Sequence, residues 1–350
     1  MQQLQSDVTA KLDRIAERFA QRSDVHELQF GITQPSTGLE WSFGEPKQYF
    51  IASVTKLYTT AIVLQLRASG DLTFDTPAAD ILGADTLAGL NTFGGTDRAA
   101  GITIGHLLSH TSGIPDYFEG APKGGESVMA RMLRDDVRWS FDDAVGTSRQ
   151  LPAPFAPGTP GKALYSDTNF QLLGKVIETV TAGSYEAGVD ERVIRRLGLD
   201  DTYLFTESTL DRADTVSSFL NGRAPLPRPQ AMASFGPDGS IVSTTDDGIE
   251  FLRAFLTGDL FPVEYIDELT ATWRTVFTPL EYGIGIMRFA LPRILSPFAP
   301  VPAMIGHSGA SGSVLYRVPD LDLYLCGTLN QVKNRSLPYR LMATLVNALR

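Results

Sequence analysis

Cysteine is almost absent from this chain, which has one such residue, Cys326, among 350. A single cysteine excludes an intrachain disulfide and a cysteine cluster for a metal. Cys326 lies in the apolar run "LDLYLCGTL", which favours a small buried side chain over a nucleophile. Histidine is also scarce, with four residues. His106 and His110 lack the glutamate of a zinc-binding H-E-x-x-H helix, so we expect structural roles for them and no bound metal.

Positive charge is in deficit, with 30 Lys and Arg against 40 Asp and Glu and a net charge of -10. Binding phosphates needs clustered basic residues, so nucleic acid is excluded as a partner. No run reaches the roughly 18 uninterrupted apolar residues that span a membrane. The first 22 residues carry charges throughout and no apolar signal-peptide core. We expect a cytoplasmic protein from the sequence as written, with an exported form whose signal has been removed as the alternative.

The order of patterns along the chain predicts its organisation. "HELQFGIT" and "GLEWSFG" have the composition of two strands, and "YGIGIMRFAL", "SGSVLYRVP" and "LDLYLCGTLN" that of three more near the end. Signals between them are mostly helical. We therefore predict an α+β protein, with one mixed domain from residues 1–70 together with 235–350 and a mostly helical domain, 71–234, inserted between them.

"FIASVTKLYTT" places Ser53 and Lys56 three residues apart at the start of an apolar helix. Positions i and i+3 share a helix face, and a helix N-terminus offers free N–H groups. A serine is a weak nucleophile until a base takes its proton. A lysine with a lowered pKa can do this, or a charged lysine can hold a neighbouring phenolate. Taken alone, the pair is more typical of an ordinary helix start with a lysine that reaches to solvent.

Two further groups have chemical potential. Tyr165 in "YSDTN" is a candidate base or proton shuttle, and the alternative is a core tyrosine beside a helix cap. His307 in "GHSGASGS" can donate to a substrate carboxylate or steer a proton, and the alternative is a solvated histidine in a Gly-rich turn. "GHSGA" also resembles a nucleophile elbow around Ser308. That elbow needs a histidine after the serine, and none follows His307.

Together, in this order, the three groups resemble the penicillin-recognising serine hydrolases. The nearest branch holds the class C β-lactamases, the D-alanyl-D-alanine carboxypeptidases and the family VIII carboxylesterases. "LLSHTSGIPD", "PGT", "LGLDDT" and "YGIG" extend the resemblance over most of Phe50 to Asn330. It implies a β-lactamase/transpeptidase-like fold, with helices on both faces of an antiparallel sheet. It also implies an active site in the cleft between sheet domain and helical domain, and no cofactor.

The resemblance also implies roles. Ser53 is the acylated nucleophile, and Lys56 and Tyr165 activate it and later activate water. The oxyanion hole is formed by two backbone N–H groups, those of Ser53 and Ala310. His307 stands where β-lactamases often have lysine. The implied catalytic residues are Ser53, Lys56, Tyr165 and His307, and the implied substrate-binding residues are Asp167, Ser308 and Gly309.

Two departures from the class C pattern bear on the substrate. Asp167 stands where asparagine is usual, and an ionised carboxylate only accepts hydrogen bonds. It can bond Lys56, which would raise the lysine pKa and favour Tyr165 as the base. His307 is mostly uncharged near neutral pH and grips a carboxylate less firmly than lysine. Both departures favour peptidase, amidase or esterase chemistry over β-lactam turnover.

We therefore expect a serine hydrolase that cleaves a small-molecule ester, amide or peptide, of carboxylesterase or D-amino-acid peptidase/amidase type. The alternatives are a class C-like β-lactamase and a penicillin-binding or sensing module that is acylated without turnover. The stretch "MRFALPRILSPFAPVPAM" before His307 either walls an acyl pocket, which favours an ester, or is an ordinary edge strand and loop. A monomer is favoured.

Overall fold

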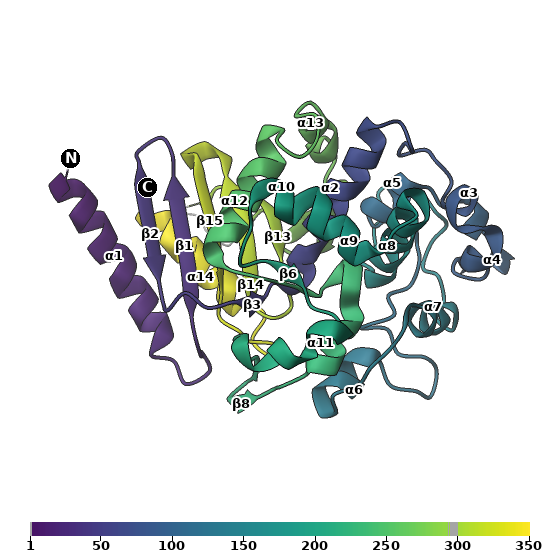
Figure 1. Ribbon diagram of the computed structural model, residues 1–350, viewed down its shortest axis with the longest axis horizontal. Helices are drawn as coiled ribbons and strands as arrows, with labels where there is room; N and C mark the ends of the chain where they lie inside the picture. Colours follow the sequence, from purple (N-terminus) through teal and green to yellow (C-terminus); the bar gives the residue numbers. More distant parts are fainter. Residues whose placement is uncertain (1, 293, 295–299) are drawn as a thin grey trace.

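One antiparallel sheet of eight strands dominates the computed structural model, which describes residues 2–292, 294 and 300–350. The strand order is β10-β11-β12-β13-β14-β15-β1-β2. The first strands of the chain therefore lie beside the last, with β1 hydrogen-bonded to both β2 and β15 (Figure 1). The strands are β1 (Gln29–Gln34), β2 (Leu39–Phe43), β10 (Arg274–Phe277), β11 (Leu280–Tyr282), β12 (Met287–Phe289), β13 (Met304–Ser308), β14 (Ser313–Val318) and β15 (Leu323–Thr328).

Both faces of the sheet are buried because its central strands are apolar on both sides. Successive side chains of a strand point to opposite faces. In β14, Val314 and Tyr316 belong to one apolar cluster and Leu315 to the other. In β15, Leu325 and Cys326 divide in the same way, and Cys326 is a buried free thiol as predicted.

Helices cover both faces, as expected for the α+β fold. The two terminal helices, α1 and α14, pack on each other and on one face, with Lys11 Nζ donating to the Ala348 carbonyl at 2.9 Å (Figure 1). On the opposite face α12 packs against β1, β14 and β15. The helices of this part are α1 (Gln2–Ala20), α2 (Thr55–Ala68), α12 (Thr245–Thr257), α13 (Tyr265–Thr270) and α14 (Leu337–Ala348).

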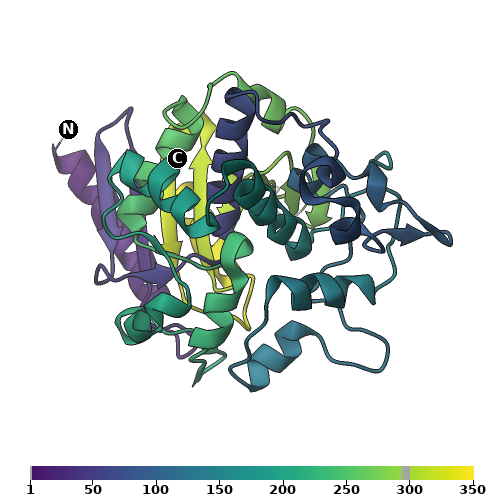
Figure 2. The ribbon, with the colours of Figure 1, turned by 45° about the vertical axis from the view of Figure 1, so that its right-hand side comes forward.

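The middle of the chain is mostly helical, and in Figure 2 its blue and teal helices gather to the right of the sheet. Helix α8 is central to it and packs against both α2 and α5. The boundaries predicted at residues 70/71 and 234/235 remain a prediction. The helices here are α3 (Ala78–Leu82), α4 (Ala84–Leu87), α5 (Ile104–Leu108), α6 (Val128–Arg134), α7 (Phe141–Arg149), α8 (Asp167–Thr181), α9 (Tyr185–Val189), α10 (Arg195–Leu197) and α11 (Pro229–Phe235).

Short strands complete the fold. The three-stranded sheet β3-β9-β6 consists of Tyr49–Phe50, Ile241–Ser243 and Tyr203–Leu204. Two separate hairpins, β4–β5 and β7–β8, join Thr92–Phe93 to Thr96–Asp97 and Leu220–Asn221 to Ala224–Pro225. In the described part of the chain, no helix combines the length and the apolar character needed to cross a membrane.

One local expectation is corrected. The stretch "YGIGIMRFAL" is not one strand, because a turn at residues 283–286 separates β11 from β12. Gly285 lies in that turn with φ 68° and donates to the Leu108 carbonyl at 2.9 Å, so the turn is tied to α5. Of the apolar stretch before His307, residues 293 and 295–299 lie outside the described residues. Its role as an acyl wall stays a prediction.

Helix α2 is buried on nearly all sides, as its sequence predicted. Tyr58 of this helix stacks on Phe251 of α12, with ring centroids 3.6 Å apart and an angle of 4° between the ring planes. Both rings are fully buried in the same apolar cluster. This contact connects the helix that follows the candidate nucleophile to the helix that covers the sheet.

Replacing Phe251 by alanine should therefore destabilise the protein by about 3–5 kcal/mol, because it leaves a cavity beside Tyr58. Urea unfolding would measure the loss. The control is Phe93→Ala, whose ring in the β4–β5 hairpin is 38% exposed and should cost less than about 1 kcal/mol. Equal costs for the two variants would contradict the assignment of this core.

Candidate active site

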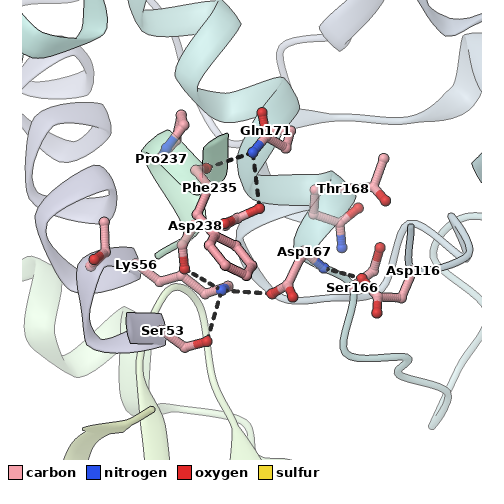
Figure 3. A network of polar contacts seen from close by, with 12 residues as sticks. Ser53, Lys56, Asp116, Ser166, Asp167, Thr168, Gln171, Phe235, Pro237 and Asp238 are labelled. Atoms are coloured by element: carbon pink, nitrogen blue, oxygen red, sulfur yellow. Dashed lines mark hydrogen bonds and ion pairs between the residues drawn. The ribbon is translucent and has the colours of Figure 1, made fainter. Parts of the chain in front are cut away.

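Lys56 is the centre of the site and is completely buried. Its ammonium nitrogen lies 3.2 Å from Ser53 Oγ, 2.7 Å from the Asp238 carbonyl oxygen and 2.7 Å from Asp167 Oδ1 (Figure 3). A lysine ammonium has three donors and no acceptor. These three partners therefore use its full donor capacity.

The surroundings keep Lys56 charged. Burial alone lowers the pKa of a lysine, but the charges of Asp167 and Asp238 outweigh burial and raise the pKa of Lys56 above its usual value. The predicted contact between Asp167 and Lys56, and its effect on the lysine pKa, are confirmed. A protonated lysine with three hydrogen bonds cannot accept the Ser53 proton, so the base must be another group.

Ser53 lies in a 3-10 turn, η1 (Ala52–Val54), so the α-helix begins two residues later than predicted. Ala52 has φ 47°, which is rare for a residue with a side chain. The β13–β14 connection holds the chain just before this turn. Ser311 Oγ donates to the Phe50 carbonyl at 3.2 Å, and Ser313 Oγ donates to the Ile51 carbonyl at 2.7 Å.

The two backbone N–H groups that the resemblance implied as an oxyanion hole, those of Ser53 and Ala310, remain a prediction that the local structure is compatible with. Ala310 is in the turn after β13 and lines the same pocket as Ser53. Neither the Ser53 amide nor the Ala310 amide has an acceptor among the described residues. Gly309 allows the close approach, because a Cβ there would lie 2.6 Å from the Ile51 carbonyl oxygen. Unpaired amides beside a nucleophile can stabilise a developing oxyanion.

Tyr165 also lies next to Ser53 and is partly exposed to the pocket. Burial among protein atoms and the charge of Asp167 raise its pKa well above that of a free tyrosine, and only its hydrogen bond with Ser53 lowers it. Lys56 Nζ lies 5.2 Å from the Tyr165 ring centroid. Tyr165 is therefore a neutral phenol in the free protein, with its oxygen available to the serine proton.

The two histidines of "HLLSH" have different structural roles. His106 belongs to the N-terminal cap of α5, where it exchanges hydrogen bonds with the N-cap residue Thr103. His110 Nδ1 accepts from the Ser166 amide at 3.1 Å, and its ring lies 4.4 Å from that of Tyr165. Burial holds the pKa of His110 well below its usual value. His110 thus fixes the loop that presents Tyr165.

His307 lies behind the reacting groups. It is completely buried in β13, its Nε2 is 3.1 Å from the Tyr282 hydroxyl, and it is absent from the pocket lining. Burial first, and then the charge of Lys56, lower its pKa to about 3, which confirms that the ring is neutral near pH 7. In this arrangement His307 does not reach a substrate carboxylate, and its predicted catalytic role would be indirect. The neighbouring Ser308 faces the pocket, with its Oγ 2.5 Å from the Tyr339 hydroxyl.

Sequence reasoning missed two carboxylates. Asp238, in a buried turn, gives its carbonyl to Lys56, while its Oδ2 accepts from Tyr117 and Gln171, both at 3.0 Å. Asp116 accepts from the Asp167 amide at 2.8 Å (Figure 3). Asp116 ends the quoted motif "LLSHTSGIPD", which could have drawn attention to it. Nothing in "GPDGS" distinguishes Asp238 from the residues of other turns.

One pocket of about 740 Å³ opens beside Ser53 and contains all three predicted substrate-binding residues. This volume is within the range of small-molecule sites. Its lining comes from segments far apart in the chain and is mainly apolar. Aromatic and methionine side chains contribute most, among them Phe118, Met132, Met232, Phe235, Phe277 and Met287.

Comparisons with known proteins identify the family to which this chain is similar. Residues 25–348 match the family described as Beta-lactamase. Penicillin-binding protein 4 of Amycolatopsis lactamdurans is 30% identical over 244 residues, which are 68% of this chain and 58% of that protein. Esterase EstB of Burkholderia gladioli is 31% identical over 173 residues, 45% of this chain and 38% of the esterase. The chain thus spans less than two thirds of the length of these relatives.

Solved structures share the fold. The D-amino acid amidase from Ochrobactrum anthropi SV3, complexed with L-phenylalanine amide, aligns with a TM-score of 0.79 and 18% identity, and the alignment covers 98% of each chain. At this identity the likeness establishes the β-lactamase/transpeptidase-like fold and says nothing of the substrate.

Replacing Asp167 by asparagine should cost about 3–5 kcal/mol at pH 7, because it leaves the Lys56 charge buried without its partner. Burial would then lower the lysine pKa below its unfolded value, so the loss should shrink as pH rises from 7 toward 10. Urea unfolding at several pH values would measure this. The control, Glu250→Gln, removes an exposed ion pair with Arg253 and should change stability by less than about 1 kcal/mol. A loss that does not change with pH would contradict the assigned charge.

Proposed function

The chain belongs to the Beta-lactamase family of serine hydrolases, which act through an acyl-enzyme, and from this premise we propose that it hydrolyses esters or amides through an acyl-enzyme on Ser53. The observation that carries this proposal is the contact between Ser53 Oγ and the charged, fully bonded Lys56. Lys56 donates to the serine oxygen, so the serine proton must point elsewhere. The hydroxyl oxygen of Tyr165 is positioned to accept it.

In the acylation step, Ser53 Oγ attacks the substrate carbonyl carbon while its proton passes to the Tyr165 oxygen. Tyr165 gives its own proton to the leaving alcohol or amine, so the phenol remains neutral overall. The Ser53 and Ala310 amides donate to the oxyanion that forms. A proton relay of this kind does not require a free phenolate, which agrees with the raised pKa of Tyr165.

In the second step a water molecule replaces the leaving group beside Tyr165. The water oxygen attacks the acyl carbon while one water proton passes to the Tyr165 oxygen. Tyr165 in turn gives its own proton to Ser53 Oγ, which leaves the acyl carbon as a hydroxyl. Lys56 stays charged in both steps and fixes Ser53 and Asp167 relative to each other. Its predicted part in activation is therefore electrostatic and positional.

The pocket favours substrates with an apolar group. Phe118, Met132, Met232 and Phe235 lie on its wall, and burying apolar surface there contributes roughly 25 cal/mol per Å². Asp167 is unable to donate to a substrate carbonyl, and His307 is buried and neutral. Both features disfavour penicillins, which carry a carboxylate, relative to apolar esters and amides.

The nucleophile is tested by Ser53→Ala with p-nitrophenyl butyrate. We expect turnover by the parent protein and a loss of at least about 1000-fold in the variant, because alanine has no hydroxyl to form the acyl-enzyme. Mass spectrometry of the parent protein after rapid acid quenching should find one butyryl group on Ser53. Full activity in Ser53→Ala would overturn the assignment.

The oxyanion hole is tested by Gly309→Ala. The new Cβ would push the β13–β14 turn away from Ile51, displace the Ala310 amide and lower kcat by about 100-fold. Gly146 of α7 is the matched control, because a Cβ there has no atom within 4 Å. If Gly309→Ala keeps the parental kcat while remaining folded, Ala310 is not part of the hole.

A further inference from the structure

Among the charged residues that line the mainly apolar pocket, acidic residues outnumber basic ones. Asp116, Glu119, Asp167 and Asp238 all belong to it, and Arg335 is the one basic residue among those lining positions. Arg335 is already engaged, with Nη1 2.6 Å from Glu119 Oε1. Lys56 lies behind the lining with its three donors occupied. A cationic ligand would therefore meet more opposite charge here than an anionic one.

One buried carboxylate oxygen of the pocket lining lacks a donor, and another has only Lys56 as its partner. Asp238 is 1% exposed, and its Oδ1 has no hydrogen-bond partner within the described chain. Asp167 is 7% exposed, and its Oδ1 is paired there with Lys56 alone. Buried polar atoms are nearly always satisfied. Unpaired acceptors that belong to a pocket lining are consistent with a donor supplied by a ligand.

Asp116 forms no ion pair with a basic side chain among the described residues. Its oxygens accept only from backbone amides, those of Asp167 at 2.8 Å and Glu119 at 2.7 Å. Burial, and then repulsion from Asp167, raise its pKa to about 7. Besides Asp167, the titratable groups that interact with it are Glu119, Tyr117 and Tyr165.

We propose that the pocket binds the free ammonium group of an amino-acid ester or amide, held by the carboxylates of Asp116 and Asp167. This inference rests on the proposed function. Ser53 Oγ and Asp167 Oδ1 are both bonded to the same lysine nitrogen. A group held by Asp167 is therefore close to the carbonyl that Ser53 attacks, as an ammonium on the adjacent carbon would be. An asparagine at this position would offer that ammonium only an uncharged acceptor.

The ammonium would also assist the reaction. The charges of Asp167, Asp238 and Asp116 all raise the pKa of Tyr165. A cation bound beside them offsets their field and lowers the pKa of the phenol, which makes its O–H a better proton donor to the leaving group in the relay. The ammonium should therefore raise kcat as well as lower KM.

Binding tests the site without catalysis. In Ser53→Ala, calorimetry should find that 2-phenylethylamine binds at least about tenfold more tightly than 2-phenylethanol, because the amine adds a charge-assisted hydrogen bond. The alkylamine stays charged through pH 8. Its affinity should rise between pH 6 and 8 as Asp116 ionises. Equal affinity for amine and alcohol, or an amine affinity that does not change with pH, would overturn the proposal.

Kinetics test the substrate class. We expect phenylalanine p-nitroanilide, in one or both enantiomers, to exceed 3-phenylpropionyl p-nitroanilide in kcat/KM by at least about tenfold. Asp116→Asn should bring this ratio toward one, while the control Asp320→Asn, at an exposed turn position, should preserve it. A ratio near one in the parent protein contradicts the ammonium site.

The two proposals fail separately. Ser53-dependent turnover of p-nitrophenyl butyrate without any preference for the ammonium leaves the proposed function standing and removes this inference. If Ser53→Ala keeps its esterase activity but binds the amine selectively, the acyl-enzyme assignment falls and the ammonium site stands.

Discussion

A single buried positive charge determines how the active region is assembled. Lys56 comes from α2, while its partners Ser53, Asp167 and the Asp238 carbonyl come from the preceding turn, from α8 and from the connection after α11. A charge removed from water is tolerated only when its partners are in place. The same three contacts therefore hold separate parts of the chain together and set the positions of the reacting groups.

The protonation states of the surrounding side chains are consistent with that charge. Lys56 keeps its proton because Asp167 and Asp238 outweigh burial, and Tyr165 keeps its own because it is buried beside the same carboxylates. His110 and His307 stay neutral and place no further positive charge near Lys56. A proton relay through Tyr165 is compatible with these protonation states, because Lys56 and Tyr165 are both protonated before and after the reaction.

Sequence reasoning succeeded where chemistry depends on local spacing. Ser53 and Lys56 share a helix start, and the strand patterns predicted strands near both ends of the chain, while the antiparallel sheet was implied by the family resemblance. It could not identify the carbonyl of Asp238, because every residue has a carbonyl and only tertiary packing selects one. The direction in which His307 points depends on the β12–β13 register and on Tyr282. Neither is encoded within "GHSGASGS".

The position of β1 has a consequence for synthesis. Its two neighbours are β2, which follows at once, and β15, which begins at Leu323. During synthesis on the ribosome, one edge of β1 therefore stays unpaired until β15 has emerged. Pairing over so long a separation is slow, and open strand edges recruit other chains. The nascent protein is consequently most exposed to aggregation before its final strand emerges, when most of its helices have already been made.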